Sequence, residues 1–123
     1  MTPSIVIANT GICFLTENDM AADVVKSVNG VPIRLTDERW VHIIENHDDM
    51  AGYRDDVLSA VEEPQYVING YEGALIALRR MEGERFLAVI YKELSQTDGF
   101  IITAYFTSKL KLEREVILWQ QRK

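Results

Sequence analysis

Four β-prone runs separated by short polar turns fill the C-terminal half of the chain, and they constrain its fold more than any other feature. The runs are residues 65–68, 74–80, 85–93 and 100–107. The links between them contain Asn69-Gly70, Gly83 and Asp98-Gly99, which favour tight turns. Because such short links join antiparallel neighbours, the sequence predicts a roughly four-stranded antiparallel sheet.

A helix from about Asp37 to His47 is predicted ahead of these strands. Thr36 suits its N-cap, and the acidic side chains that follow would lie in the first turn, where the helix dipole favours anions. At 100° per residue, one side of this helix should face the core and the other the solvent. The core side comprises Trp40, Ile43, Ile44 and His47, and the solvent side comprises Glu38, His42, Glu45 and Asn46.

A second helix should follow closely. Asp48 and Asp49 supply its N-cap, and apolar residues recur at helical spacing from Tyr53 to Val61 until Pro64 ends the segment. The expected fold class is therefore α+β, with two N-terminal helices packed on the sheet.

The ends of the chain give weaker patterns. Ser4–Ala8 and Ile12–Thr16, joined by Asn9-Thr10-Gly11, suggest an extra N-terminal hairpin. Residues 17–30 indicate a polar connection with room for a short helix, and the tail 109–123 fits either a helix or a further strand. At 123 residues and 47% hydrophobic side chains, we expect a single domain over 1–123, with a core at 31–119.

Charge is divided unevenly along the chain, whose formal net charge is −6. Residues 1–64 hold four Lys and Arg against twelve Asp and Glu, whereas residues 65–123 hold nine against seven. The acidic total argues mildly against nucleic acid, because phosphate binding draws on Lys and Arg. Any anion-binding surface should therefore lie on the C-terminal half.

The sequence favours the cytoplasm. The apolar run from Ile5 to Leu15 is too short to span a bilayer and has no basic residue before it, so it makes a poor signal peptide. Cys13 is the sole cysteine, which excludes an internal disulfide and indicates a buried thiol in a reducing compartment.

The two histidines are the side chains best suited to proton exchange near neutral pH. Five residues separate His42 from His47, which turns them about 140° apart on a helix and disfavours a shared metal. His47 could bear on a substrate phosphate, or it could simply cap the helix C-terminus. His42 has Glu38 and Glu45 nearby, which is typical of a surface ion pair.

A row of hydroxyls is predicted on the last strand. Every second residue of this strand from 103 to 107 carries a hydroxyl: Thr103, Tyr105 and Thr107. These hydroxyls could bind phosphate oxygens or position a 2′-hydroxyl. Alternatively, they belong to an ordinary half-exposed strand, in which Thr and Tyr are favoured for packing. Lys92 is either a substrate-facing cation or an edge residue whose head reaches solvent. Arg79 and its neighbour Arg80 point oppositely, so at most one faces a given site.

Three segments together resemble the phage-associated branch of the Barnase–EndoU–Colicin–RelE-like (BECR fold) nucleases. They are the run Ile33-Arg34-Leu35-Thr36-Asp37-Glu38-Arg39-Trp40-Val41-His42-Ile43-Ile44-Glu45-Asn46-His47, then Tyr91-Lys92-Glu93, then Ile102-Thr103-Ala104-Tyr105-Phe106. The likeness covers roughly residues 31–119. It implies two helices before a four-stranded antiparallel sheet, and a toxin-like ribonuclease that acts on RNA without a metal or other cofactor and has a cognate inhibitor protein. In that family His42 and His47 match the helix histidines, and Thr103 and Tyr105 match a strand motif.

Two functions of different kind follow from these residues. In the first, a metal-independent endoribonuclease, His47 removes the proton of a ribose 2′-hydroxyl, and a 2′,3′-cyclic phosphate forms. His42 or Tyr105 would be the acid, and Lys92, Arg79 and Thr103 would stabilise the transition state, with Thr107 also binding substrate. In the second, the acidic chain is a catalytically inactive relative that serves as a protein-interaction module.

Overall fold

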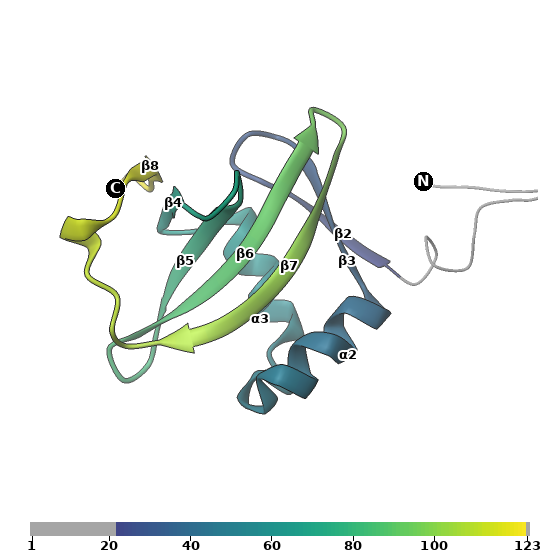
Figure 1. The fold of residues 1–123 in the computed structure, drawn as a ribbon, viewed down its shortest axis with the longest axis horizontal. Coiled ribbons are helices and arrows are strands. Elements are labelled where there is room, and N and C mark those ends of the chain that lie inside the picture. The colour runs from purple at the N-terminus through teal and green to yellow at the C-terminus, as the bar shows by residue number, and fades with distance from the viewer. Residues whose placement is uncertain (1–21, 123) are drawn as a thin grey trace, which may run out of the picture.

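The computed structural model describes residues 22–122, which form a mixed seven-stranded sheet with two α-helices against one face (Figure 1). The helices are α2 (Asp37–Asn46) and α3 (Arg54–Glu62), and the 3-10 turns η1 (Asp48–Met50) and η2 (Leu112–Arg114) follow α2 and the longest hairpin. The strands are β2 (Ala22–Lys26), β3 (Pro32–Thr36), β4 (Tyr66–Asn69), β5 (Leu75–Met81), β6 (Arg85–Ser95), β7 (Asp98–Thr107) and β8 (Ile117–Gln120). Their order across the sheet is β2-β3-β7-β6-β5-β4-β8. None of the helices within residues 22–122 is long and apolar enough to cross a membrane.

The prediction of a four-stranded antiparallel sheet is wrong in extent and in direction. Strands β4 to β7 pair antiparallel as expected from their short links. Beyond them, β2, β3 and β8 also join the sheet, and β3 runs parallel to β7 with Arg34 beside Phe100. Because β3 and β7 are far apart in the chain, no local sequence pattern predicts this pairing. Parallel neighbours need a long connection, and α2 and α3 form part of it.

The extra strand β2 lies where a polar connection was predicted. Residues 22–26 pair antiparallel with β3, and the turn between them uses Gly30 at φ +79°. The buried Ser27 hydroxyl donates a 2.6 Å hydrogen bond to Glu93 on β6, which ties this turn to the sheet. The N-terminal hairpin predicted at Ser4–Ala8 and Ile12–Thr16, and Cys13 within it, lie outside the described residues.

The first helix begins and ends close to its predicted bounds. The Thr36 side chain accepts a 3.0 Å hydrogen bond from the Arg39 N–H, as an N-cap should, and Ile43 is buried against the sheet. The second helix begins later than predicted. Its proposed N-cap residues Asp48 and Asp49 lie in η1 instead, and the chain then passes through Gly52 at φ +88°, a conformation that interrupts a helix, before α3 starts.

A β-bulge in β7 changes the predicted alternation of its side chains. Ile90 on β6 lies opposite Thr103, but the next residue, Tyr91, lies opposite Ile101, so Ile102 is an extra residue. The shift moves Ile101 to the helix-covered face, where it is buried, so the alternation that sets the hydroxyl row does not extend back to it. Beyond the bulge the predicted row is confirmed, since Thr103, Tyr105 and Thr107 face one way.

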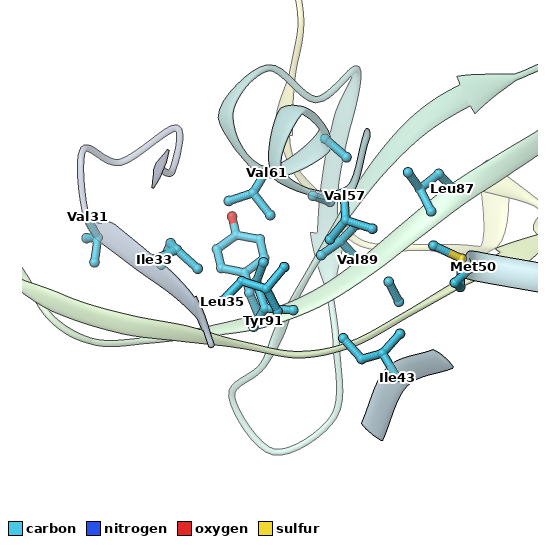
Figure 2. Packing of buried hydrophobic residues seen from close by; sticks show 14 residues of the cluster. Val31, Ile33, Leu35, Ile43, Met50, Val57, Val61, Leu87, Val89 and Tyr91 are labelled. Atoms are coloured by element: carbon cyan, nitrogen blue, oxygen red, sulfur yellow. The ribbon is translucent and has the colours of Figure 1, made fainter. Parts of the chain in front are cut away.

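The main hydrophobic core lies between the helices and the sheet (Figure 2). Leu87, Val89 and Tyr91 of β6 meet Val57 and Val61 of α3 there. The phenol oxygen of Tyr91 points toward Val61 and has no hydrogen-bond partner among the described residues. Loss of solvation, together with the negative charge of Glu93, raises the pKa of this phenol well above its ordinary value.

The opposite face of the sheet carries a second, smaller cluster made of Ile68, Leu78, Phe86 and Ala88. No helix covers it. The segment after β7, which we call the strap (residues 108–116), instead packs Leu110 and Leu112 against the cluster and leads into β8 at the edge of β4 (Figure 1). Of the two structures expected for the tail, the strand is therefore the one formed.

Candidate functional site

His47 is held where α2 ends. Its backbone N–H donates a 2.8 Å hydrogen bond to the Ile43 carbonyl, and its own carbonyl accepts one from the N–H of Met50, which is fully buried. The chain on both sides of the histidine is thus anchored to the core. Its half-buried ring lies with its centroid 5.8 Å from that of Tyr105, at an interplanar angle of 33°. The structure therefore brings together two predicted site residues from distant parts of the chain.

Tyr105 lies on a stretch of β7 that has no strand paired on one side among the described residues. The register of β3 against β7 contains only the pair of Arg34 and Phe100, and β3 runs directly into α2 after Thr36. The end of α2 and η1 occupy the space beside the second half of β7 instead (Figure 1). This arrangement explains why a histidine at a helix end reaches a strand tyrosine.

The hydroxyl row extends the site along β7. Thr103, Tyr105 and Thr107 lie opposite Ile90, Ala88 and Phe86, on the face away from the helices. All three are half-buried. The Thr107 hydroxyl oxygen accepts a 3.3 Å hydrogen bond from the backbone N–H of Lys109, at the start of the strap. Thr103 and Thr107 thus lie about 7 Å along the strand on either side of Tyr105, which is the member of the row that contacts His47.

His42 lies on the solvent side of α2, as its helical position predicted. The side chain is 56% exposed, and its Nδ1 lies 3.6 Å from Glu45 Oε1. Of its two interpretations, this contact corresponds to the surface ion pair. His42 therefore makes no part of the contact between His47 and Tyr105.

The two predicted substrate-binding cations are separated from that contact. Lys92 shares the face of Tyr105 but lies opposite Phe100, four residues along β6 from Ala88, or about 13 Å at 3.3 Å per residue. Arg79 lies on the helix-covered face, opposite Leu87, and its guanidinium donates to the Glu63 carbonyl at 3.2 Å. The prediction that Arg79 binds substrate beside the hydroxyls is therefore corrected. Neighbouring strand residues alternate between faces, and it is Arg80 that shares the face of the hydroxyl row.

The lysines of the strap were not among the predicted site residues. Lys109 and Lys111 are exposed and alternate with Leu110 and Leu112, which pack onto the second cluster. Period-two alternation of leucine and lysine was the available signal, and it indicates an extended segment with one apolar and one cationic side. These two lysines place positive charge directly after the hydroxyl row.

Arg85 is a further cation that sequence reasoning missed. Its guanidinium lies 4.0 Å from the centre of the Phe106 ring, which holds it in place by a cation–π contact. Together with Phe106 and Thr107 it lines an open pocket of about 300 Å³ at the end of β7. Because Phe106 packs on the helix-covered core, Arg85 lies on that side of the sheet and shares with Thr107 only this open pocket at the end of the strand.

Ion pairing differs between the two halves of the chain. Arg34 pairs with Asp98 at 2.8 Å, and Arg54 pairs with Asp23 and Asp37 at 2.9 and 2.7 Å. Within residues 22–122, no carboxylate lies within 4.0 Å of the guanidinium groups of Arg79, Arg80 and Arg85. The C-terminal half thus offers unneutralised cations, as its sequence charge indicated.

Over the same described residues, no three His, Cys, Asp or Glu side chains converge as a metal site would require. In comparisons with known proteins, no protein-family model, curated protein or solved structure matches the chain.

Proposed function

We propose that this protein is a metal-independent, toxin-like endoribonuclease of the Barnase–EndoU–Colicin–RelE-like type, with His47 and Tyr105 as its catalytic residues. The observation that supports it most directly is the contact of the two rings, 5.8 Å between centroids, at the uncovered part of β7. A histidine and a tyrosine can each transfer a proton, and two rings this close could both reach one bound phosphate.

In the proposed reaction His47 takes the proton of a ribose 2′-hydroxyl. The 2′-oxygen then bonds to the adjacent phosphorus, and the bond from phosphorus to the 5′-oxygen breaks. Tyr105 gives its proton to the departing 5′-oxygen, so the products are a 2′,3′-cyclic phosphate and a 5′-hydroxyl. Thr107 donates a hydrogen bond to a phosphate oxygen, while Lys109 supplies positive charge as negative charge develops. Thr103, about 13 Å from Thr107 along β7, would contact a neighbouring nucleotide.

The strap also supports RNA as the substrate. Phosphate contacts from Lys and Arg provide most of the affinity for nucleic acid, and most of the Lys and Arg residues lie in the C-terminal half. Lys109 and Lys111 face outward over a sheet surface that would otherwise be apolar. The phosphates of a single-stranded RNA lying across the strap would therefore contact Lys111 and Lys109 on the way to His47.

The test is incubation of the purified protein with total RNA in excess EDTA, followed by analysis of the fragment ends. Cleavage should persist with EDTA and leave cyclic phosphates. The His47→Ala variant should lose about 10²-fold or more of the rate, and Tyr105→Phe roughly 10-fold or more. His42→Ala is the matched control, because it removes the exposed histidine paired with Glu45 and should keep the parent rate.

Equal rates for the parent and His47→Ala would remove His47 from the mechanism. An EDTA-sensitive rate would contradict the metal-independent route. A fall for His42→Ala as large as that for His47→Ala would mean that the family's first histidine, and not Tyr105, is the acid.

A non-catalytic interaction module is the second candidate, and one observation favours it. Val116, Ile117 and Leu118 are exposed by 62, 40 and 52% at the edge strand β8, which makes three consecutive aliphatic side chains in solvent. An exposed apolar edge is a common site of strand addition by a partner. Intact RNA with every variant, together with a partner lost on Leu118→Lys, would favour this function.

A further inference from the structure

A small pocket with an unusual lining lies away from the catalytic pair, at the ends of β4, β5 and β8. It measures about 200 Å³ and is lined by Gln65, Tyr66, Arg80, Gln120 and Gln121. Drug-sized ligands occupy pockets of roughly 300 to 1,000 Å³, so this one suits a single small ring system. Its lining contains three amides, one phenol and one guanidinium, but no carboxylate.

Two of the lining side chains are held in place by the fold. The Gln65 side-chain oxygen accepts a hydrogen bond from the Arg80 backbone N–H, which leaves the amide NH₂ of Gln65 as a donor toward the pocket. The Arg80 guanidinium lies 4.8 Å from the centre of the Phe86 ring. The pocket is therefore partly organised before any ligand arrives, which lowers the entropic cost of binding.

The lining selects a class of ligand. Amides offer donors and acceptors to a neutral partner, and a guanidinium plane or a phenol ring offers a stacking surface. A phosphate would use the guanidinium and the amide NH₂ groups but neither the amide oxygens nor the phenol ring, and an apolar ligand would use none of the amides. The partner that uses every group is a planar heterocycle with hydrogen-bonding edges.

We infer that this pocket binds a nucleobase of the single-stranded RNA whose cleavage is proposed at His47 and Tyr105. The inference rests on the proposed function and adds a base-reading subsite to it. Glutamine side chains read the edges of bases by paired hydrogen bonds, and RNA-binding surfaces stack unpaired bases on arginine and aromatic side chains.

The pocket and the catalytic pair lie on the same face of the sheet. Tyr66, Leu78, Ala88 and Tyr105 form one row across neighbouring strands β4, β5, β6 and β7. Three strand spacings of roughly 4.8 Å put the Tyr66 and Tyr105 backbones about 14 Å apart. Lys109 and Lys111 lie on the strap that covers the sheet surface between them. A short single-stranded RNA could thus reach both the pocket and the catalytic pair, with its phosphates over the strap.

Binding is tested separately from cleavage with four DNA tetramers, each of one base, because they lack the 2′-hydroxyl that the proposed reaction needs. In ¹H–¹⁵N NMR titrations of the full chain, the side-chain amide signals of Gln65, Gln120 and Gln121 should shift with one or two of the tetramers. Gln120→Ala and Gln121→Ala should each weaken that binding by at least 10-fold. Gln96→Ala, which removes an exposed glutamine from the turn between β6 and β7, should bind as the parent does.

A second readout is the sequence around the cleavage sites in a random RNA pool. In this pool the parent should prefer one base at a fixed distance from the cleaved bond, and Gln120→Ala should lose that preference. In the tetramer titration, His47→Ala should bind as the parent does. Absence of a shift with every tetramer, or equal effects of Gln120→Ala and Gln96→Ala, would overturn the subsite even if the parent cleaves RNA. Tetramer binding without any cleavage would uphold the subsite and overturn the ribonuclease.

Discussion

The two faces of the sheet are built in different ways. On one face, fourteen buried residues from the helices and strands form a closed core, whereas the other face has a buried cluster of four beneath a single extended strap. The hydroxyl row and Arg80 lie on the second face, and the lysines of the strap lie above it, whereas Arg79 and Arg85 lie on the helix-covered side. The comparison suggests that the helix-covered face supplies the stability and leaves the strap face free for binding.

The largest expected effect is a difference in stability between core substitutions on the two faces. Leu87→Ala opens a cavity in the helix-covered core and should lower the free energy of unfolding by about 2–5 kcal/mol. Leu112→Ala removes the same atoms from the half-exposed strap and should cost only about 1 kcal/mol. Urea denaturation of both variants measures the difference. Equal losses would break the comparison, because the strap would then stabilise the fold as much as the core does.

A smaller effect is expected on the salt dependence of RNA binding, which should respond to cations on the strap face and not to those elsewhere. The double variant Lys109→Gln with Lys111→Gln should reduce the slope of log affinity for RNA against log salt by about 1.4, at roughly 0.7 per phosphate contact. The unfolding free energy should stay within about 0.5 kcal/mol of the parent. Lys26→Gln with Arg39→Gln changes the net charge equally at exposed positions on β2 and α2. A matching slope change in that control would show a whole-molecule charge effect instead of contacts at the strap.

The smallest effect concerns the one unsatisfied group found in the described core. Tyr91→Phe removes a buried hydroxyl without a partner, so the free energy of unfolding at pH 7 should stay unchanged or rise by up to about 1 kcal/mol. Because the folded state raises the pKa of this phenol, the unfolded chain releases the proton first, and parent stability should fall as the pH rises above about 10.

The Phe variant should lose that part of the alkaline dependence. Urea midpoints for parent and variant at pH 7 and in alkaline buffers provide the measurement. A clear loss of stability at neutral pH would mean that the hydroxyl has a partner, such as a buried water, and that this part of the core is better satisfied than the described contacts show.

Local patterns predicted the local parts of this fold. Thr36 caps α2 as expected, and the strands from β4 to β7 follow the runs between the glycine turns. The second helix was misplaced because the positive φ of Gly52 cannot be read from an acidic pair that resembles an N-cap. The parallel pairing of β3 with β7 depends on segments far apart in the chain, which periodicity does not connect.

The candidate site divides in the same way. The hydroxyl row depends only on strand alternation, so Thr103, Tyr105 and Thr107 were placed correctly on one face. The proximity of His47 to Tyr105 depends on where β3 stops and how η1 turns, so spacing within the helix could not establish it. Arg79 was misassigned because alternation shows that it and Arg80 point oppositely but not which of them faces the hydroxyls.

The contact between His47 and Tyr105 also has a consequence for folding order. The β6–β7 hairpin joins neighbours in the chain and can form early, whereas β3 must find β7 across most of the domain, a closure whose entropic cost is not repaid by local contacts. The histidine reaches the tyrosine only when α2 is held beside β7 by that late pairing. A partly folded chain would therefore lack the proposed active site, and a cell making this protein would meet the proposed activity only once folding was nearly complete.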